Sequence, residues 1–315
     1  MLNNLQAITK NEFSYQLKSG IVWVIALILI ALCIVNYHNK YNNAIQNYEL
    51  FTQTKDNMEA DGYDIEKELQ KTPEIKKEGG TEVIENVLAY DYNNLVSSLI
   101  PFQFKDALSN TFEWLSFVFF PIIFALYGLI TATYDYHYKT IKMKAVTFSF
   151  KNIFIGKILA MSLYALLIII LLIIITYGTH YIYRTLLISQ LPYNEFASSI
   201  PASNSHSLWI VMFALSVMLL FAIFGMSIGF IVKSALIPAI ILLVFNFMIP
   251  ILGVYDPRNL LANFGHQLFN FQGNFQLFSP KPVPLVEAGA AITLSFLILT
   301  LLSFFISNQQ SKYVK

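Results

Sequence analysis

The stretch from Tyr134 to Lys157, YDYHYKTIKMKAVTFSFKNIFIGK, decides how this chain is arranged. It carries five lysines and one acid, Asp135, and apolar runs flank it on both sides. In a membrane-spanning protein, short lysine-rich loops stay on the cytoplasmic side. As a helix over 137–148, the stretch has Lys139 and Lys142 on one flank and a largely apolar face formed by Tyr138, Ile141, Ala145 and Phe148. This pattern predicts a short amphipathic helix between two spans, accessible to a protein outside the bilayer.

The composition indicates a membrane protein. Of the 315 residues, 56% are hydrophobic and 12% are charged, against roughly 45–50% and 25% in soluble domains. Several apolar runs reach the length of about 18 residues that crosses a bilayer core of about 30 Å as a helix. One run, Leu166 to Ile175, contains no polar residue. We therefore expect an all-α polytopic protein of the cell membrane.

Six membrane-spanning helices are expected, over residues 20–37, 112–133, 153–177, 208–232, 235–254 and 285–306. The remaining segments are 1–19, 38–111, 134–152, 178–207, 255–284 and 307–315. An even number of spans places both termini on one side. The N-terminal segment, residues 134–157, Lys233 and the C-terminal tail share that side and hold ten lysines and two acids, Glu12 and Asp135. We therefore expect both termini to be cytoplasmic.

Two of the segments outside the spans are expected to fold. Residues 1–19 predict an amphipathic helix at the membrane surface, with a disordered tail as the alternative. Its stripe is formed by Leu2, Leu5, Ile8 and Glu12. The insert 38–111 holds 13 acids and 7 lysines, and we expect it to be extracellular and to form helices over Lys40–Leu69 and Thr81–Leu99, the second capped by Thr81. Because the insert is polar, we expect little core of its own and packing against the outer ends of the spans.

Several residues within the spans have structural consequences. Pro121 predicts a kink in the second span. Gly225 and Gly229 allow close approach of another helix, either within the monomer or in a dimer. Asn246 is the one strongly polar residue near the middle of a span; helix-to-helix hydrogen bonding and cargo contact are both open for it. The aromatic segment 255–284 predicts a re-entrant element of one or two short helices, with an ordinary interfacial loop as the alternative.

No catalytic constellation is visible. The sequence lacks a Gly-x-Ser-x-Gly elbow, a His-Glu-x-x-His pair and a phosphate-binding loop. The five histidines are scattered over different loops, and the paired carboxylates of the insert resemble a solvated surface more than a metal site. We therefore expect no catalytic residues, no metal, no directly bound cofactor and no nucleic-acid partner. An intramembrane enzyme is disfavoured on the same grounds.

The order of segments and one local motif resemble the membrane subunit of type-2 ABC exporters, in the branch of bacitracin-resistance, sodium and peptide exporters. The shared order is a surface helix, six spans, a coupling helix between the second and third, and a re-entrant hairpin between the fifth and sixth. The motif comprises Tyr138 to Lys142, Ser149, and the apolar-Gly-Lys start of the third span that ends at Gly156-Lys157. Lys139 stands where the family commonly has glycine, and Phe150 where it commonly has arginine.

The resemblance implies a bacterial permease that forms a homodimer or pairs with a related permease, and that binds two copies of a separate cytoplasmic ATPase. That partner would use ATP and Mg, and this chain would contact it through the coupling helix, at Tyr138, Lys139, Ile141, Lys142, Ala145 and Phe148. A central cargo path would involve Asn246, Phe117, Phe120 and Phe124. An amphipathic or hydrophobic cargo (peptide, antibiotic or lipid-like) suits the aromatic spans, and such a system would confer drug or antimicrobial-peptide resistance.

One competing interpretation shares this architecture without transport. In it, the protein is a peptide sensor or immunity protein, and the insert 38–111 binds the ligand outside the cell. An ATPase gene beside this one would favour export, whereas a histidine kinase gene alone would favour sensing.

Overall fold

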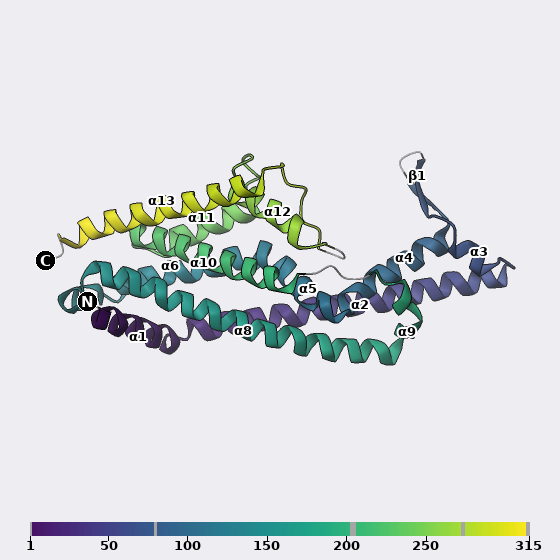
Figure 1. Cartoon of the computed structure of the whole chain (residues 1–315), viewed down its shortest axis with the longest axis horizontal. Helices are drawn as coiled ribbons and strands as arrows, with labels where there is room; N and C mark the ends of the chain where they lie inside the picture. The colour runs from purple at the N-terminus through teal and green to yellow at the C-terminus, as the bar shows by residue number, and fades with distance from the viewer. Residues whose placement is uncertain (1, 79–80, 202–205, 272–274, 313–315) are drawn as a thin grey trace.

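The molecule is a long bundle of helices with both chain termini at one end (Figure 1). The computed structural model describes residues 2–78, 81–201, 206–271 and 275–312. The α-helices are α1 (Leu2–Lys18), α2 (Ile21–Ala60), α3 (Ile65–Leu69), α4 (Val87–Leu99), α5 (Ala107–Trp114), α6 (Phe120–His137), α7 (Ile141–Thr147), α8 (Phe150–Gln190), α9 (Tyr193–Phe196), α10 (Ser207–Val232), α11 (Leu236–Phe247), α12 (Pro257–Leu268) and α13 (Leu285–Lys312). We call the end that carries α1, α7 and both termini the base.

Five of the described helices are long and apolar enough to cross a membrane: Ile21–Ala60, Phe104–His137, Phe150–Gln190, Ser207–Val232 and Leu285–Gln309. They correspond to the first, second, third, fourth and sixth expected spans. The expected fifth span, 235–254, is helical only over α11, whose 12 residues reach about 18 Å at 1.5 Å per residue. Residues 248–256 leave the helix and lead into α12.

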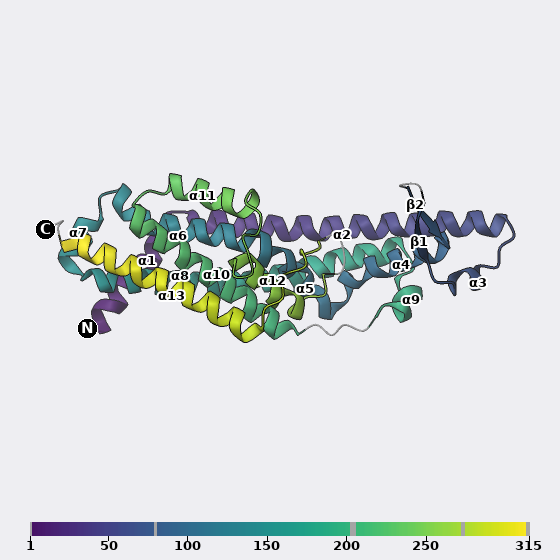
Figure 2. The same cartoon turned by 90° about the horizontal axis from the view of Figure 1, so that it is seen from above.

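Two helices extend far beyond the apolar stretches that predicted them. The helix α2 continues through 40 residues to Ala60, and α8 continues through 41 residues to Gln190, so each is about 60 Å long. The expectation that 178–190 is a loop is therefore wrong. With α3, α4 and α9, these extensions form an elongated projection away from the base, which we call the arm (Figure 2).

The arm has a hydrophobic core of its own, contrary to our expectation. Its buried residues come from α2, α4 with the following turn, and the 187–200 segment: Tyr37, Ala44, Phe51, Leu88, Leu95, Val96, Leu99, Ile100, Phe102, Leu187, Leu191, Tyr193, Phe196 and Ile200. The sequence did not reveal this core because its apolar side chains are spread over three separate segments. Each segment alone is mostly polar, and together they bury one continuous surface.

The insert also departs from the expected helix that begins at Thr81. Residues Thr81–Glu85 form strand β2, which pairs antiparallel with β1 (Glu74–Glu78). A helix starts only at Val87, after Asn86 with a left-handed φ of 59°. Thr81 and Val83 lie in a segment rich in β-branched residues, Thr-Glu-Val-Ile-Glu, whose alternation favours a strand. The helix expected over Lys40–Leu69 is confirmed as α2 and α3, with a break at 61–64.

Shorter elements complete the chain. They are the 3-10 turns η1 (Ile100–Phe102), η2 (Phe104–Asp106) and η4 (Ala197–Ser199) and the π-helical turn η3 (Leu115–Phe119). The π-helical turn lies directly before Pro121, which has no amide hydrogen and whose ring would collide with the carbonyl group of residue 117 in a regular helix. The irregularity that Pro121 predicted is therefore a π-helical turn at the start of α6.

The closest helix contact in the molecule is between α6 and α10. A Cβ atom on Gly128 would lie 1.8 Å from the carbonyl oxygen of Ala222, and one on Gly225 would lie 1.8 Å from that of Ala125. A Cβ atom on Gly229 would lie 2.8 Å from the Cβ of Ala132. The glycines of α10 therefore pack within this monomer, which resolves the alternative left open by their spacing.

The segment 255–284 contains one described helix, α12, and an extended return to α13. Two asparagines one turn apart hold the return against α12: Asn259 donates to and accepts from the backbone of Lys281, and Asn263 accepts from the amide of Val283. Phe269 and Phe271 pack with Phe117, with ring centroids 5.8 and 5.7 Å from it. This segment is therefore fixed onto the bundle.

Candidate functional site

Four charged side chains form a closed ring at the base, where α1, α6, α7 and α8 meet. Lys157 of α8 lies 3.0 Å from Glu12 of α1 and 2.8 Å from Asp135 of α6. Lys144 of α7 lies 2.5 Å from Glu12 and 2.7 Å from Asp135. Glu12, Asp135 and Lys157 are at most 1% exposed. Each lysine therefore bridges both carboxylates, and the ring carries no net charge.

Further hydrogen bonds satisfy the ring. The third bond of Lys157 goes to the carbonyl oxygen of Thr131, at 2.8 Å, and Thr140 donates to Asp135 at 2.7 Å. Lone buried charges would be expensive to desolvate, whereas a group of two cations and two carboxylates in mutual ion-pair contact is tolerated. The ring thus fixes the positions of four helices relative to one another.

Packing around the ring holds α1 tightly against α8. A Cβ atom on Gly156 would lie 2.9 Å from Ile8, so glycine permits the close approach of the two helices. Phe13 stacks on Tyr164 at 4.5 Å. The Tyr164 hydroxyl donates to the carbonyl oxygen of Phe13 at 2.8 Å. The N-terminal segment is therefore a packed helix, and the alternative of a disordered tail is wrong.

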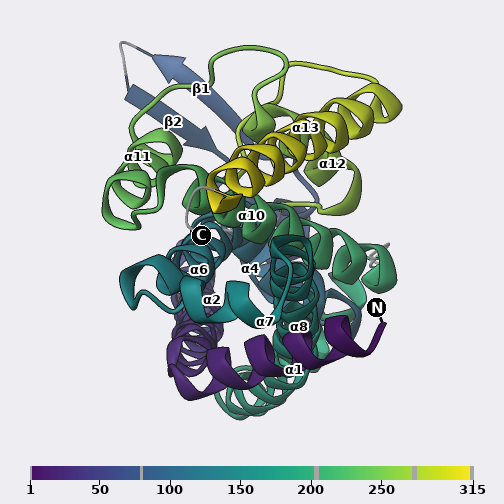
Figure 3. The same cartoon turned by 90° about the vertical axis from the view of Figure 1, so that its left-hand side faces the viewer.

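The short helix α7 lies between the base ends of α6 and α8, with α1 crossing below them (Figure 3). Lys144 is its connection to the ring. Away from the ring, Met143 is 68% and Val146 is 89% exposed, and Lys142 is exposed as well. The helix α7 therefore carries two exposed apolar side chains and an exposed cation.

The expected contact residues are divided between this outward surface and the interior. Lys139 and Lys142 are exposed, and so is Tyr138, which precedes α7. Ile141 and Phe148 are half-buried, and the side chain of Ala145 lies outside the described part. The helix is shorter than expected because α6 runs on to His137 and Lys139 takes a left-handed φ of 56°. Of the apolar face expected from a helix over 137–148, Tyr138 is thus exposed, whereas Ile141 and Phe148 are half-buried.

The sequence did not lead us to predict the ring, or the exposure of Met143 and Val146, which we call the exposed pair. A signal for the ring was present: Glu12 and Asp135 are the only two acids among ten lysines in the segments assigned to that side. Lys157 was also visible in the Gly156-Lys157 motif, but nothing in the sequence indicated its partners. Met143 and Val146 carried no such signal, because their exposure depends on how α7 is oriented.

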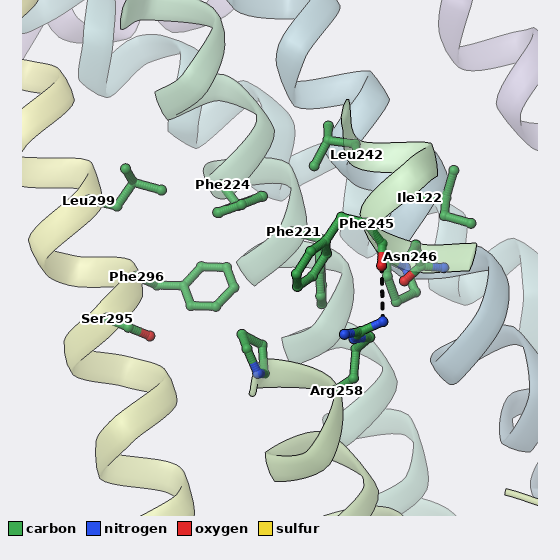
Figure 4. A pocket seen from close by; sticks show the side chains of 12 residues that line it. Ile122, Phe221, Phe224, Leu242, Phe245, Asn246, Arg258, Ser295, Phe296 and Leu299 are labelled. Carbon is green, nitrogen blue, oxygen red and sulfur yellow. Dashed lines mark hydrogen bonds between the residues drawn. The ribbon is translucent and has the colours of Figure 1, made fainter. Parts of the chain in front are cut away.

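A second group of candidate residues lines two adjoining cavities between α6, α10, α11, α12 and α13. The smaller is about 150 Å³ and the larger about 400 Å³, and Pro121, Phe221, Asn246 and Arg258 line both. Figure 4 shows the smaller one, with Phe221, Phe224 and Phe296 facing its interior. Of the expected cargo contacts, Asn246 lines both cavities and Phe117 lines the larger one.

The other two expected cargo contacts lie elsewhere. Phe120 and Phe124 are 0% and 1% exposed in the bundle core. Their rings pack against each other at 5.8 Å, and neither lines the cavities that contain Asn246. The sequence could not distinguish the phenylalanines of this segment that face the cavity from those in the core, because they all lie in one apolar run.

Arg258 closes one wall of these cavities by binding the end of α11. Its guanidinium donates to the carbonyl oxygens of Phe245 at 2.9 Å, Ile249 at 2.6 Å and Pro250 at 3.0 Å. It also donates twice to Asp256, at 3.1 and 2.7 Å. All five N–H groups of the side chain are therefore in use. We call this arrangement the Arg258 clasp.

Electrostatics support the clasp. Partial burial raises the pKa of Asp256, but the hydrogen bonds from Arg258 and from the Leu252 amide outweigh it and hold that pKa below its ordinary value. A cation at the carboxyl end of α11 also complements the helix dipole. The clasp thus satisfies backbone carbonyl groups that α11 leaves open where it ends.

The ring is a structural link between helices. In the part of the chain that the structure describes, no group of three His, Cys, Asp or Glu side chains is placed to hold a metal ion. The ring joins four helices. Its one partly exposed member, Lys144, lies on α7, the helix that also carries the exposed Met143 and Val146. Searches of known families, curated proteins and solved structures found no match to this chain.

Proposed function

We propose that this chain is the membrane-spanning permease subunit of an ATP-driven exporter of the type-2 ABC class. The observation that carries the proposal is α7: one side is bonded to the ion ring, and the other presents Lys142, Met143 and Val146 to the outside. A separate cytoplasmic ATPase, in two copies, binds this surface and uses ATP and Mg. A second permease copy, identical or related, completes the assembly in the bacterial cell membrane.

The ring connects α7 to the helices that its displacement would move. A displacement of α7 acts through Lys144 on Glu12 and Asp135, and through these on Lys157. The helices α1, α6 and α8 therefore move with α7 as a unit, since separating any one of them would expose a buried charge. This is the property that a coupling helix requires.

In this proposal the chain crosses the bilayer six times, with both termini in the cytoplasm. The fifth crossing consists of α11 and its extended continuation to Val254. Non-helical backbone at membrane depth needs its polar groups satisfied by the protein. The Arg258 clasp does this for Phe245, Ile249 and Pro250. The cargo is amphipathic or hydrophobic, in keeping with the aromatic lining of the two cavities.

The exposed pair on α7 gives a direct test. We expect Met143→Asp combined with Val146→Asp to reduce co-purification of the ATPase encoded in the adjacent reading frame at least tenfold, because two carboxylates replace an apolar contact. Lys139→Glu combined with Lys142→Glu will reduce it as well. The measurement is the ratio of ATPase to permease recovered from membranes on an affinity-tagged permease.

A matched control lies in the arm. Leu50 and Tyr63 are also exposed, at 53% and 54%, so Leu50→Asp combined with Tyr63→Asp adds the same charges at the opposite end. This variant should retain the ATPase in full. Equal retention by the α7 variant, with an unchanged thermal midpoint, would show that α7 is not the coupling surface.

The second candidate function is peptide sensing without transport. It is favoured by one observation: the arm has its own core and a polar cavity of about 310 Å³ lined by Lys40, Asn43, Asn47, Asn94, Ser97, Ser98 and Pro101. Amide and hydroxyl groups of this kind suit a peptide backbone. Loss of ligand response without loss of ATPase binding in Asn43→Leu combined with Asn94→Leu would favour this function.

A further inference from the structure

We propose that the cavities between α6, α10, α11, α12 and α13 bind one acyl chain of a bilayer phospholipid, and that they recognise the chain and not the charge of its head group. The proposal does not depend on export, and it would hold for either candidate function. It rests on the cavity walls, on the bonding of the polar groups among them, and on the surfaces through which the cavity is reached.

The walls are apolar. Four aromatic rings line the smaller cavity, those of Phe221, Phe224, Phe245 and Phe296, together with leucine, isoleucine and proline side chains (Figure 4). An apolar cavity of about 150 Å³ excludes water and accepts a group the size of benzene. The adjoining cavity of about 400 Å³ shares Pro121, Phe221, Asn246 and Arg258 with it, so the two cavities meet at these side chains and offer a chain more room than either alone.

The polar groups in the cavity walls do not favour a charged ligand. Among the described residues, Arg258 is the only ionisable side chain in either lining, and its five N–H groups are all bonded within the protein. The hydroxyl group of Ser295 donates to the carbonyl oxygen of Ile292 at 2.8 Å. Asn246 contributes a neutral amide. A phosphate group would therefore find no free cation here, whereas a hydrocarbon chain needs none.

The surfaces around the cavity lie where lipid chains are found. On α11, Ile240 and Ile241 are 54% and 60% exposed, and on α13, Leu294 and Ile298 are 57% and 54% exposed. Only 11% of the apolar window of α13 is buried within the protein. Both helices therefore present apolar faces to the hydrocarbon of the bilayer, and a chain enters from that side without crossing polar surface.

Photolabelling tests the site. Full-length protein is reconstituted in phosphatidylcholine vesicles that contain a small fraction of phosphatidylcholine with a diazirine in the middle of one acyl chain. After irradiation, labelled peptides are mapped by mass spectrometry. We expect labelling of Phe221 and Phe224 to exceed labelling of the outward residues Leu294 and Ile298 at least fivefold. A phosphatidylglycerol probe should change this ratio less than twofold.

A filling variant and its control make the test specific. Ser295→Phe places a ring in the cavity and should lower labelling of Phe221 and Phe224 at least fivefold. Thr293→Phe adds the same ring on an exposed position of α13 and should leave it unchanged. Labelling of Trp23 and Leu27 on α2, both exposed, serves as the standard for correct insertion.

Three results would overturn the proposal. They are equal labelling of lining and outward residues, labelling that persists in Ser295→Phe, and a strong preference for the anionic probe. Because no ATPase is present in these vesicles, each result is independent of whether α7 binds one.

Discussion

Replacing Lys157 with methionine will destabilise the protein by about 3–5 kcal/mol, the penalty for removing one partner of a buried ion pair. Glu12 and Asp135 would remain buried, with Lys144 as the single cation between them. Methionine keeps the length and apolar contacts of the side chain, so the effect reports the charge. The measurement is the thermal unfolding midpoint of the purified protein in detergent, which should fall markedly.

The matched control is Lys151→Met, which removes an exposed lysine from the first turn of the same helix, α8. It should change the free energy of unfolding by less than about 0.5 kcal/mol. Combining Lys157→Met with Glu12→Gln restores neutrality in the ring and should recover part of the loss, as coupled neighbours do. If Lys157→Met and Lys151→Met behaved alike, the ring would not hold the base together.

Gly225→Ala is expected to be the second severe substitution. Its new methyl group would lie 1.8 Å from the carbonyl oxygen of Ala125, and neither backbone yields without separating α6 from α10. Overpacking of this kind costs about 3 kcal/mol or more when the obstacle is rigid. We expect a large fall in the unfolding midpoint and a reduced yield of monodisperse protein on size-exclusion chromatography.

Gly178→Ala is the control, since a Cβ atom there has nothing within 4 Å and the residue lies inside α8. Alanine should stabilise the helix at this position by about 0.5–1 kcal/mol. A destabilisation equal to that of Gly225→Ala would mean that the loss at Gly225 does not report the close contact between α6 and α10.

Five of the six expected spans could be predicted as long apolar helices from sequence because each consists of one continuous apolar run that needs no partner to be recognised. The helix α10 and the turn at Lys233, which has a left-handed φ of 57°, fell where expected. The arm could not be predicted in this way. Its part of α8 is rich in Tyr, Thr and Ser, and it packs as a helix along α2, with Leu187 buried in the core of the arm.

The candidate site was predictable in place but not in composition. The concentration of lysines located the base, and Gly156-Lys157 marked the start of α8. Ion pairing between Glu12 and Lys157 joins residues 145 positions apart, and no local pattern records a contact over that distance. The same reason explains why α11 was expected to be longer: nothing near Phe247 reveals that Arg258 will hold its end.

The uninterrupted length of α2 has a further consequence. This helix starts just after Gly20, whose left-handed φ of 78° separates it from α1, and it continues without a break into the arm. A rod of about 60 Å that tilts by about 5° at one end moves its tip by about 5 Å. The arm is therefore the long end of a lever: a tilt of α2 that barely shifts the helix at the base displaces the far end of the arm by several ångströms.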